Sequence, residues 1–438
     1  MSEIHAQTVP YVRDTMLPEQ APPARQSGVV LWLRENLFSG PVNIALTLIG
    51  VWMIWYLVSG IWPWLAHSVW RADNLSECRS IITASFGEGA TGACWAMIRE
   101  RWNQFLFGFY PQDLYWRPVL AFVLLFVALA PVLFSQIPRK ALYFSAFYPA
   151  LAYWLLWGGS AWWPLMVLAG FAAGLAVWAV VSRWSVPLGL LAGLAATLVW
   201  WFWIAAPLAA ELEKLISLHI LQVRSDRFGG FVLSITIGVA GIAMSLPLGI
   251  VLALARRSDM PIIKMFAVVF IEFIRGVPLI TLLFVASLLL NYFLPPGTNF
   301  DIILRVIIMV TLFAAAYMAE VIRGGLAALP KGQYEAADAL GLDYWKAQRL
   351  IILPQALKIS IPGIVSTFIG MFKDTTLVVF VGLLDPLKGV TDAVRASTDW
   401  KGIYWEPYIF VAAIFFIFCY AMSRYSMYLE RRLKRDHR

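Results

Sequence analysis

Two residues of opposite charge, Lys373 and Asp374, lie side by side within a long apolar stretch and are followed by Thr375 and Thr376. Adjacent positions on a helix point about 100° apart, so the two charges cannot neutralise each other face to face. A zwitterion such as a free amino acid needs an anion for its ammonium group and donors for its carboxylate, and these four side chains could supply both. We therefore predict a binding site here. In the alternative interpretation, each charge pairs with another helix or with a partner chain and is structural.

Two further pairs of opposite charge also lie in apolar stretches, Glu272 with Arg275 and Glu320 with Arg323. Residues three positions apart lie on the same face of a helix, so we expect an ion pair within each helix. Ionisable groups inside a membrane are costly and are candidates for function. Glu272 and Arg275 are therefore also candidates for contact with a bound substrate.

Cys78 and Cys94 fall in one long polar insertion, and we predict a disulfide between them if that insertion lies in an oxidising compartment. The alternative is two free thiols that fill space in a folded loop. The pair is too sparse for a metal site, and His219 and His437 are isolated, so we expect no metal. We find no Ser-His-Asp grouping and no paired catalytic carboxylates, and therefore do not expect an enzyme.

The composition indicates which elements must position these residues. The chain has 438 residues, of which 61% are hydrophobic and only 14% charged, too few charges for a soluble domain. We predict an all-α membrane protein with about ten transmembrane helices, because backbone groups cannot stay unpaired in lipid. The spans are expected near Trp52, Leu125, Leu151, Phe171, Val199, Ile242, Leu282, Val310, Ile369 and Ile414.

The distribution of Lys and Arg predicts the orientation. If both termini are cytoplasmic, the pairs Arg139–Lys140 and Arg256–Arg257 and the basic tail all lie inside, as the positive-inside bias requires. The net charge of +8 is then mainly a topology signal with some attraction to anionic lipid, and no nucleic-acid partner is expected. No apolar core directly follows a basic start, so we expect no cleaved signal peptide.

Composition also divides the chain into segments. We predict a cytoplasmic segment (1–43), a five-helix membrane extension (44–208) with a periplasmic insertion (61–117), an interfacial linker (209–228), a five-helix core (229–425) with a cytoplasmic loop (321–360), and a basic tail (426–438). Gly276 and Pro278 interrupt the seventh span and Pro247 the sixth. Such residues mostly kink helices, so we interpret them as shaping the spans.

The stretch "GQYEAADALGLDYWKAQRLIILPQA", from Gly332 to Ala356, is unusually polar for the second half of the chain. Helix formers lead to Gly341, which can adopt the left-handed conformation that ends a helix, and Asp343 can cap the next helix. We predict two short helices that meet at a bend. Ala336 and Ala337 would leave a low surface for a partner, with the charge of Glu335 at its rim.

This stretch resembles the signature of ABC importer permeases, in which Glu-Ala-Ala is followed by three residues, Gly, nine residues, then Ile, any residue, Leu and Pro. Every position is filled here, and the flanking segments resemble the polar amino-acid branch. The matching residues are Glu335, Ala336, Ala337, Gly341, Ile351, Leu353 and Pro354, with Arg275-Gly276-Val277-Pro278, Gln333 and Lys373-Asp374-Thr375-Thr376-Leu377 nearby. The resemblance covers about Phe228 to the C-terminus and implies a type I ABC importer permease core.

The resemblance implies an inner-membrane subunit of a bacterial importer for polar L-amino acids, working by alternating access. Its partners would be a second homologous permease chain, a dimer of ATPases and a periplasmic amino-acid-binding protein. The five extra spans resemble the long-form permeases of general L-amino-acid or glutamate/glutamine/aspartate/asparagine importers. Gln333, Glu335, Ala336, Ala337 and Gly341 would contact the ATPase. The chain has no Gly-x-x-x-x-Gly-Lys-Ser/Thr loop, so ATP and Mg would bind to the separate ATPase, and no cofactor is expected in this chain.

The main alternative is a secondary amino-acid transporter driven by ions, which would also use charges in the membrane. Such a transporter has no need for the polar hairpin, and we find no convincing repeat between the two halves of the chain. A membrane-bound enzyme would need a cluster of His or acidic residues at one interface, which is missing.

Overall fold

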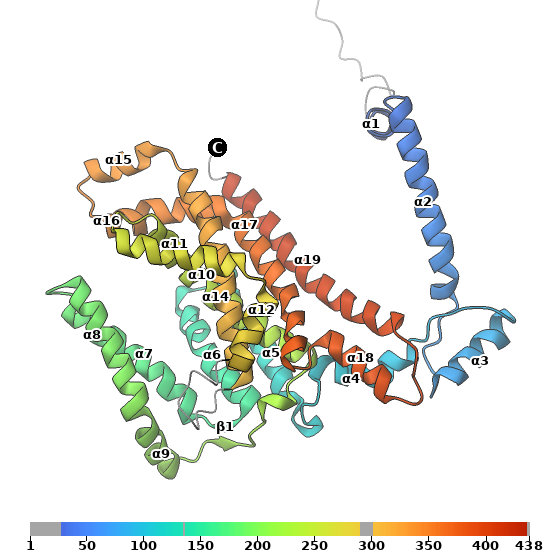
Figure 1. Cartoon of the computed structure of the whole chain (residues 1–438), viewed down its shortest axis with the longest axis horizontal. Helices are drawn as coiled ribbons and strands as arrows, with labels where there is room; N and C mark the ends of the chain where they lie inside the picture. The colour runs from blue at the N-terminus through green and yellow to red at the C-terminus, as the bar shows by residue number, and fades with distance from the viewer. Residues whose placement is uncertain (1–27, 135, 290–300, 436–438) are drawn as a thin grey trace, which may run out of the picture. The chain divides into compact units, whose positions relative to one another are not determined.

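The structure is a computed structural model that describes residues 28–134, 136–289 and 301–435. Almost all of the described elements are helices (Figure 1). The exception is a two-stranded antiparallel sheet, in which β1 (Gly159–Ser160) pairs with β2 (His219–Ile220). Residues 1–27 of the predicted cytoplasmic segment, and His437 in the predicted tail, lie outside the described residues.

Eight helical stretches in the described part are long and apolar enough to cross a membrane, or nine if one bent pair is a single span. The eight are Pro41–Ala66, Gln112–Leu133, Trp162–Val181, Val186–Leu215, Gly230–Arg256, Ile302–Ala327, Tyr344–Val381 and Trp405–Leu433. The prediction of an all-α membrane protein is therefore confirmed. The expected count of ten is reduced because α6 (Leu142–Trp157) has only 16 residues, whereas a bilayer core needs about 20.

The seventh predicted span is a broken helix. α11 (Pro261–Gly276) and the segment Leu279–Leu289, which holds α12 (Leu279–Phe284) and a π-helical turn (Val285–Leu289), meet at an angle of 103°. Val277 between them is extended (φ −107°, ψ 131°), as expected for a residue that precedes a proline. Pro278 thus ends the helix, whereas Pro247 lies within the continuous α10 (Gly230–Arg256).

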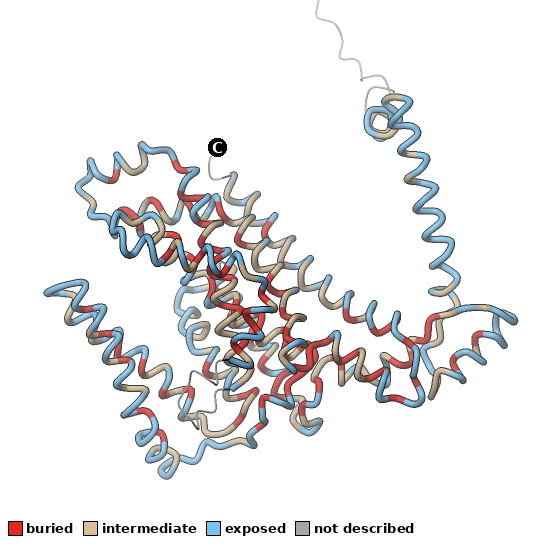
Figure 2. The backbone as a smooth tube through the Cα atoms, in the orientation of Figure 1, coloured by how far each residue is buried: buried red, intermediate tan, exposed pale blue. Residues whose placement is uncertain are grey.

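The described residues divide into two units: 28–69 with 79–93 form the first, and 70–78 with the described residues from 94 to 435 form the second. The first holds α1 (Gly28–Asn36) and α2 (Pro41–Ala66), and the side chains along α2 are almost all exposed (Figure 2). α3 (Leu75–Phe86) begins in the second unit and ends in the first. The exposed apolar surface of α2 is what a helix surrounded by lipid presents.

The second unit has its core where α10, α14 (Ile302–Ala327), α17 (Leu353–Asp374) and α19 (Trp405–Arg435) pack together. The buried residues drawn in red in Figure 2 concentrate along α10 and α14. Small residues allow the close packing: a Cβ on Gly249 of α10 would lie 2.6 Å from Cβ of Met318 on α14. The remaining core elements are α15 (Lys331–Ala339), α16 (Tyr344–Ala347), a π-helical turn (Gln348–Ile352), a 3-10 helix (Thr375–Val381) and α18 (Pro386–Ala396).

Further helices of the second unit precede this core. α5 (Trp116–Leu133) packs on α6, and α7 (Trp162–Val181) packs on α8 (Val186–Val199). A π-helical turn (Trp200–Ile204) leads into α9 (Ala205–Leu215), and Trp200 donates its indole N–H to the carbonyl of Met166 at 2.9 Å. Short 3-10 helices lie at Gln112–Leu114, Arg139–Ala141 and Ser225–Arg227.

α4 (Ala96–Phe107), in the predicted periplasmic insertion, packs against the start of α10. Gly230 there has φ +57°, and a Cβ on it would lie 2.3 Å from the carbonyl oxygen of Phe105. Only glycine fits both the left-handed backbone and this close approach. The insertion is therefore packed directly on the core.

Candidate functional site

The predicted hairpin is two short helices that meet at a bend. Gly341 follows α15 with φ +66°, and its N–H donates to the carbonyl of Asp338 at 2.9 Å. Asp343 caps α16 by accepting the backbone N–H of Lys346 at 2.9 Å. Hydrogen bonds from the side chain and the backbone of Lys346 lower the pKa of Asp343. The local geometry is the one that the sequence predicted.

The two faces of α15 differ. Glu335 and Ala336 are exposed, as is Gly341 at the bend, and can contact a partner. Ala337 is only 1% exposed, which corrects the expectation that it forms part of the partner surface. Gln333 is also turned toward the rest of the chain, where its side-chain oxygen accepts from Gln355 at 2.9 Å.

Tyr334 joins the inward face of α15 to the end of α10. Nη1 of Arg257 donates to the hydroxyl oxygen of Tyr334 at 2.9 Å. The guanidinium carbon of Arg257 lies 5.4 Å from the centroid of the Tyr334 ring. The same Nη1 donates to the carbonyl of Leu326, near the end of α14, at 3.2 Å. α10, α14 and the hairpin therefore meet at one arginine.

A cluster of charged side chains around Glu320 includes Arg256, the residue before Arg257 in the chain. Glu320 on α14, with a side chain 15% exposed, contacts three cations: Arg256 at 2.9 Å, Arg323 at 3.0 Å and Arg275 at 3.7 Å. The predicted pair of Glu320 with Arg323 is present. For Glu272 the partner is Arg256 on α10, at 2.8 Å, so the expected pair of Glu272 with Arg275 is wrong.

The physical reason for this difference is that α10, α11 and α14 converge, which brings cations from all three helices to the half-buried carboxylate of Glu320. Arg275 also lies 5.5 Å from the ring centroid of Tyr317. Glu272 and Arg275 are thus engaged in contacts between helices, which weakens their case as contacts for a substrate.

Lys373 and Asp374 lie where α17 gives way to the 3-10 helix Thr375–Val381. Lys373 is exposed and Asp374 is half-buried, and neither forms an ion pair with another described residue. Thr375 is fully buried and donates to the carbonyl of Phe372 at 2.7 Å, so it cannot contact a ligand in this conformation, contrary to the expectation. Thr376 is partly exposed and donates to the carbonyl of Lys373 at 2.9 Å. The two charges remain available for a ligand.

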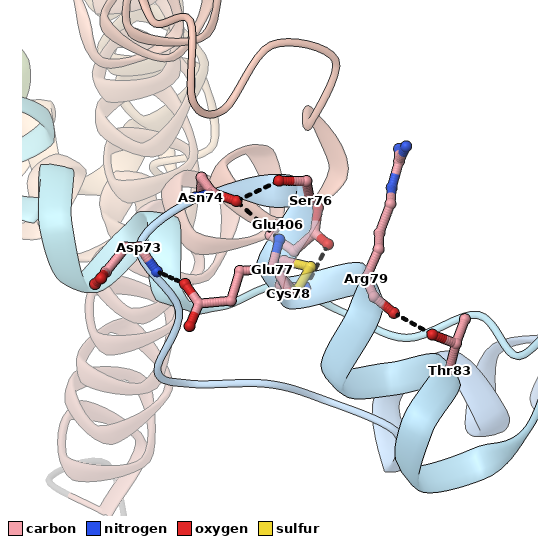
Figure 3. Close-up of a disulfide and its surroundings, with 9 residues drawn as sticks. Asp73, Asn74, Ser76, Glu77, Cys78, Arg79, Thr83 and Glu406 are labelled. Carbon is pink, nitrogen blue, oxygen red and sulfur yellow. Dashed lines mark hydrogen bonds between the residues drawn. A yellow bond between two sulfur atoms is a disulfide. The ribbon is translucent and has the colours of Figure 1, made fainter.

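At the other end of α10, the insertion is joined to the segment around α18. The structure links Cys78 and Cys94 by a disulfide, shown in Figure 3 with Glu406 close by. The backbone N–H of Cys94 donates to Oε1 of Glu406 at 2.8 Å, although this carboxylate is only 5% exposed. The buried indole of Trp400 donates to Oε2 of Glu100 at 2.6 Å.

Asp385, at the start of α18, is fully buried and accepts the backbone N–H groups of Leu387 at 3.0 Å and Lys388 at 3.1 Å. Burial raises the pKa of Asp385 to about 6, and the hydrogen bonds from Lys388 and Leu387 only partly oppose this. The helix cap therefore changes its charge state in the mildly acidic range.

Residues 245–435 match a family described as "Binding-protein-dependent transport system inner membrane component". A glutamate/glutamine/aspartate/asparagine transport system permease protein of Rhodobacter capsulatus is 63% identical over 429 residues, which are 98% of this chain and 99% of that protein. The chain belongs to the family of amino-acid ABC transporter permeases. An inner membrane amino-acid ABC transporter permease protein of Escherichia coli is 40% identical over 93% of each chain.

Among solved structures, this permease is similar to a protein described as an amino acid ABC transporter with histidines. The identity is 32%, the TM-score is 0.41, and the match covers 46% of this permease and 91% of that chain. The prediction of an ABC permease core in the second half of the chain is confirmed by the family match over residues 245–435. The chain is a multi-pass inner-membrane permease subunit rather than an enzyme, and the ATPase of such a transporter is a separate subunit.

The roles of several residues that organise the permease were not predicted from its sequence. Arg257, Glu406, Glu100 and Trp400 make their contacts with partners far away in the chain, and nothing in the local pattern marks them. For Arg256 and Arg257 a signal did exist, because both lie at the end of a predicted span, but we interpreted them only as topology charges. Within the described residues no three His, Cys, Asp or Glu side chains could hold a metal ion.

Proposed function

We propose that this permease moves polar L-amino acids, with glutamate, glutamine, aspartate and asparagine as the first candidates, from the periplasm to the cytoplasm. The substrates are suggested by the name of the 63% identical relative, which spans 98% of the chain. Transport is driven by ATP, which binds with Mg to a separate ATPase dimer. A periplasmic binding protein delivers the amino acid, and a second homologous permease completes the pore.

The observation that carries this proposal is the hairpin formed by α15 and α16. It exposes Glu335, Ala336 and Gly341 on one side and is held to α10 on the other by the hydrogen bond from Arg257 to Tyr334. Such an arrangement passes a displacement of the hairpin directly to a membrane helix. We therefore infer that the exposed face docks on the ATPase and that closure of the ATPases tilts the core helices.

The two ends of α10 support the proposed orientation. This helix has 27 residues and is about 40 Å long at 1.5 Å per residue, which is enough to cross a membrane. Its first residue packs on the disulfide-containing insertion and its last residues lie beside the hairpin. We place the hairpin and both termini in the cytoplasm and the insertion in the periplasm, where a disulfide is stable.

Lys373 and Asp374 are the proposed contacts for the substrate within the membrane, because their charges have no ion-pair partner among the described residues. Asp374 would bind the ammonium group and Lys373 the carboxylate. Asp374→Asn keeps the size of the side chain but removes its charge. Charge-assisted hydrogen bonds contribute about 1.5–3 kcal/mol, so the apparent affinity for transport should fall about ten- to hundredfold.

Uptake by the reconstituted importer tests this site, with Asp113→Asn at an exposed position as the matched control. Asp374→Asn should still copurify with the ATPase, and the affinity of the separate binding protein should not change. If Asp374→Asn transports at the wild-type rate and apparent affinity, the residue is a structural charge and the proposed site is wrong.

The docking surface is tested by copurification. Glu335→Lys reverses a charge on the exposed face of α15 and should reduce the amount of ATPase that copurifies with the permease. Asp113→Lys, at an exposed acid in the predicted periplasmic insertion, is the control and should retain the ATPase. Equal recovery of the ATPase with both variants would contradict the assignment of this face.

A further inference from the structure

The two arms of the broken helix, α11 and α12, leave the break at an angle of 103° and are held very differently (Figure 1). In α12, Leu279 and Leu283 are 4% and 0% exposed. They belong to the same buried cluster as Val378 of the 3-10 helix that follows Asp374. Of the 16 residues of α11, three are buried: Ala267, Ile271 and Ile274. The arm beside the proposed substrate site is therefore anchored, and α11 is the arm with more freedom to move.

The backbone between the two arms has the features of a pivot. Val277 is extended, and Pro278 has no N–H, so the hydrogen-bond ladder of α11 cannot continue into α12. α12 starts its own ladder, in which the N–H of Thr281 donates to the carbonyl of Pro278 at 3.0 Å. A Cβ on Gly276 would meet no neighbouring atom within 4 Å. Hinges in proteins are a few residues at the ends of elements that absorb changes in φ and ψ, and residues 276–278 fit that description.

Arg275, directly before this pivot, holds α11 to α14. Its guanidinium carbon lies 5.5 Å from the ring centroid of Tyr317, and its Nη1 lies 3.7 Å from Oε2 of Glu320. Tyr317 and Glu320 are three positions apart, so they share one face of α14. One side chain therefore fixes the end of α11 to two neighbouring residues of α14. We call this contact the Arg275 clamp.

The clamp is the longest of the three ion pairs that Glu320 makes. Nη1 of Arg256 lies 2.9 Å from Oε1, and Arg323 donates through Nε to Oε2 at 3.0 Å. The 3.7 Å to Arg275 is longer than an N–H···O hydrogen bond, which measures about 2.7–3.2 Å. When Arg275 leaves, Arg256 and Arg323 still neutralise the carboxylate, so no unpaired charge remains behind.

The other charged contact of α11 offers little resistance to movement. Glu272 lies 2.8 Å from Arg256 on α10, but its side chain is 53% exposed. Ion pairs with a solvent-exposed partner contribute little to stability. The Arg275 clamp is therefore the main polar restraint on α11, and it can be opened without a large penalty.

We propose that the contact of Arg275 with Tyr317 and Glu320 is a latch, which holds α11 against α14 and opens in each transport cycle. When the latch opens, α11 turns about residues 276–278 while α12 stays beside Asp374. This inference rests on the proposed function, in which closure of the ATPases tilts the core helices. It adds which arm of the broken helix moves and which residue restrains it. Arg275 is thus a positioning residue and not a contact for the substrate.

Removal of the latch should raise ATP hydrolysis in the absence of binding protein. The full importer is reconstituted in proteoliposomes, and hydrolysis by Arg275→Gln should be about three- to tenfold faster than by the wild type, because the restraint on the resting position is lost. Stimulation by loaded binding protein should fall by a similar factor. Arg275→Lys keeps a cation beside Tyr317 and Glu320 and should restore most of the restraint. Lys264→Gln, which loses an exposed cation of the same helix, should behave like the wild type.

A reversible cross-link distinguishes a latch from a brace that never opens. Arg275→Cys and Tyr317→Cys are combined with Cys419→Ala, which removes the free cysteine of the described chain. Positions 275 and 317 are both exposed, so a bifunctional methanethiosulfonate reagent can join them. The cross-linked importer should lose ATP-driven amino-acid transport at least tenfold and recover it on reduction. The same variant treated with a monofunctional reagent, and the Cys419→Ala permease treated with reductant, are the controls.

Transport by the cross-linked importer at the rate of the monofunctionally modified one would overturn the proposal, because α11 would then work without leaving α14. Hydrolysis by the assembled Arg275→Gln importer that is no faster than by Lys264→Gln would also overturn it. Absence of ATP-driven transport in the untreated wild type would contradict the proposed function alone. The latch is then judged by ATP hydrolysis, which the cross-link should still block.

Discussion

Arg257 at the end of α10 donates a hydrogen bond of 2.9 Å to the hydroxyl oxygen of Tyr334 on α15. The two residues are 77 positions apart in the chain, and their contact joins a membrane helix to the proposed docking hairpin. A hairpin fixed to only one helix could move without consequence for the rest of the core. This contact therefore supports transmission of movement from the ATPase to the transmembrane helices.

Removing the hydroxyl group of Tyr334 should loosen this transmission. Tyr334→Phe keeps the aromatic ring over Arg257 but loses the hydrogen bond, which contributes about 0.5–1.5 kcal/mol. We expect a two- to tenfold fall in the number of amino acids imported per ATP hydrolysed, measured in proteoliposomes. Tyr344→Phe is the matched control, because the hydroxyl of Tyr344 forms no hydrogen bond with another residue in the described part of the chain. Equal coupling in the two variants would count against a role of the contact in transmission.

The bend of the hairpin depends on Gly341 because of its backbone rather than its surroundings. A Cβ there would meet no atom within 4 Å, but φ is +66°, which strongly disfavours a β-branched residue. Gly341→Val should insert into the membrane normally, yet show reduced stimulation of the ATPase by loaded binding protein. Gly332→Val, in α15 and equally free of neighbours, should behave much more like the wild type. Wild-type coupling in Gly341→Val would refute the docking assignment.

The disulfide between Cys78 and Cys94 should stabilise the insertion. The two residues are 16 positions apart. Closing a loop of this size lowers the entropy of the unfolded chain and so stabilises the folded state by about 3 kcal/mol in the loop-closure estimate. Thermal unfolding of the Cys78→Ala and Cys94→Ala double variant should therefore occur at a lower temperature. Mass spectrometry of unreduced fragments checks the bond itself. Full alkylation of both thiols without reductant would show that it does not form.

The buried cap at Asp385 should make stability depend on pH. Its pKa is raised from 3.8 to about 6 in the folded protein, so the folded state holds the proton more tightly than the unfolded state. The resulting stabilisation is complete below about pH 4 and is lost as the pH rises through about 6, by about 3 kcal/mol in total. Asp385→Asn keeps a capping oxygen without a charge, so this component should vanish. The unfolding temperature of both proteins between pH 4 and pH 7 is the measurement, and parallel curves would contradict the assignment.

Local features of the permease could be predicted from its sequence because local physics determines them. Gly341 and Asp343 shape the hairpin through backbone conformation and capping, which depend on a few neighbouring residues. The broken helix at Pro278 could have been predicted in the same way, but we assigned a kinked continuous span.

Contacts between distant segments could not be predicted. Arg256 bonds Glu272 and Glu320 because three helices converge, and Glu406 receives the N–H of Cys94 across 312 positions. The inward orientation of Ala337 likewise depends on how α15 packs, since the sequence presents Ala336 and Ala337 as equivalent. Such pairings follow from helix packing and leave no mark in a local pattern.

The most direct test of this account is amino-acid uptake by the permease reconstituted with its partner permease and its ATPase. Labelled L-glutamate and L-glutamine are supplied with the periplasmic binding protein. Uptake and ATP hydrolysis are measured in the same samples, first in the presence of a sodium or proton gradient and then in its absence. We predict uptake that requires ATP and binding protein and does not change when the ion gradient is collapsed. Uptake that persists without ATP and stops when the ion gradient is collapsed would identify an ion-driven transporter and contradict the account.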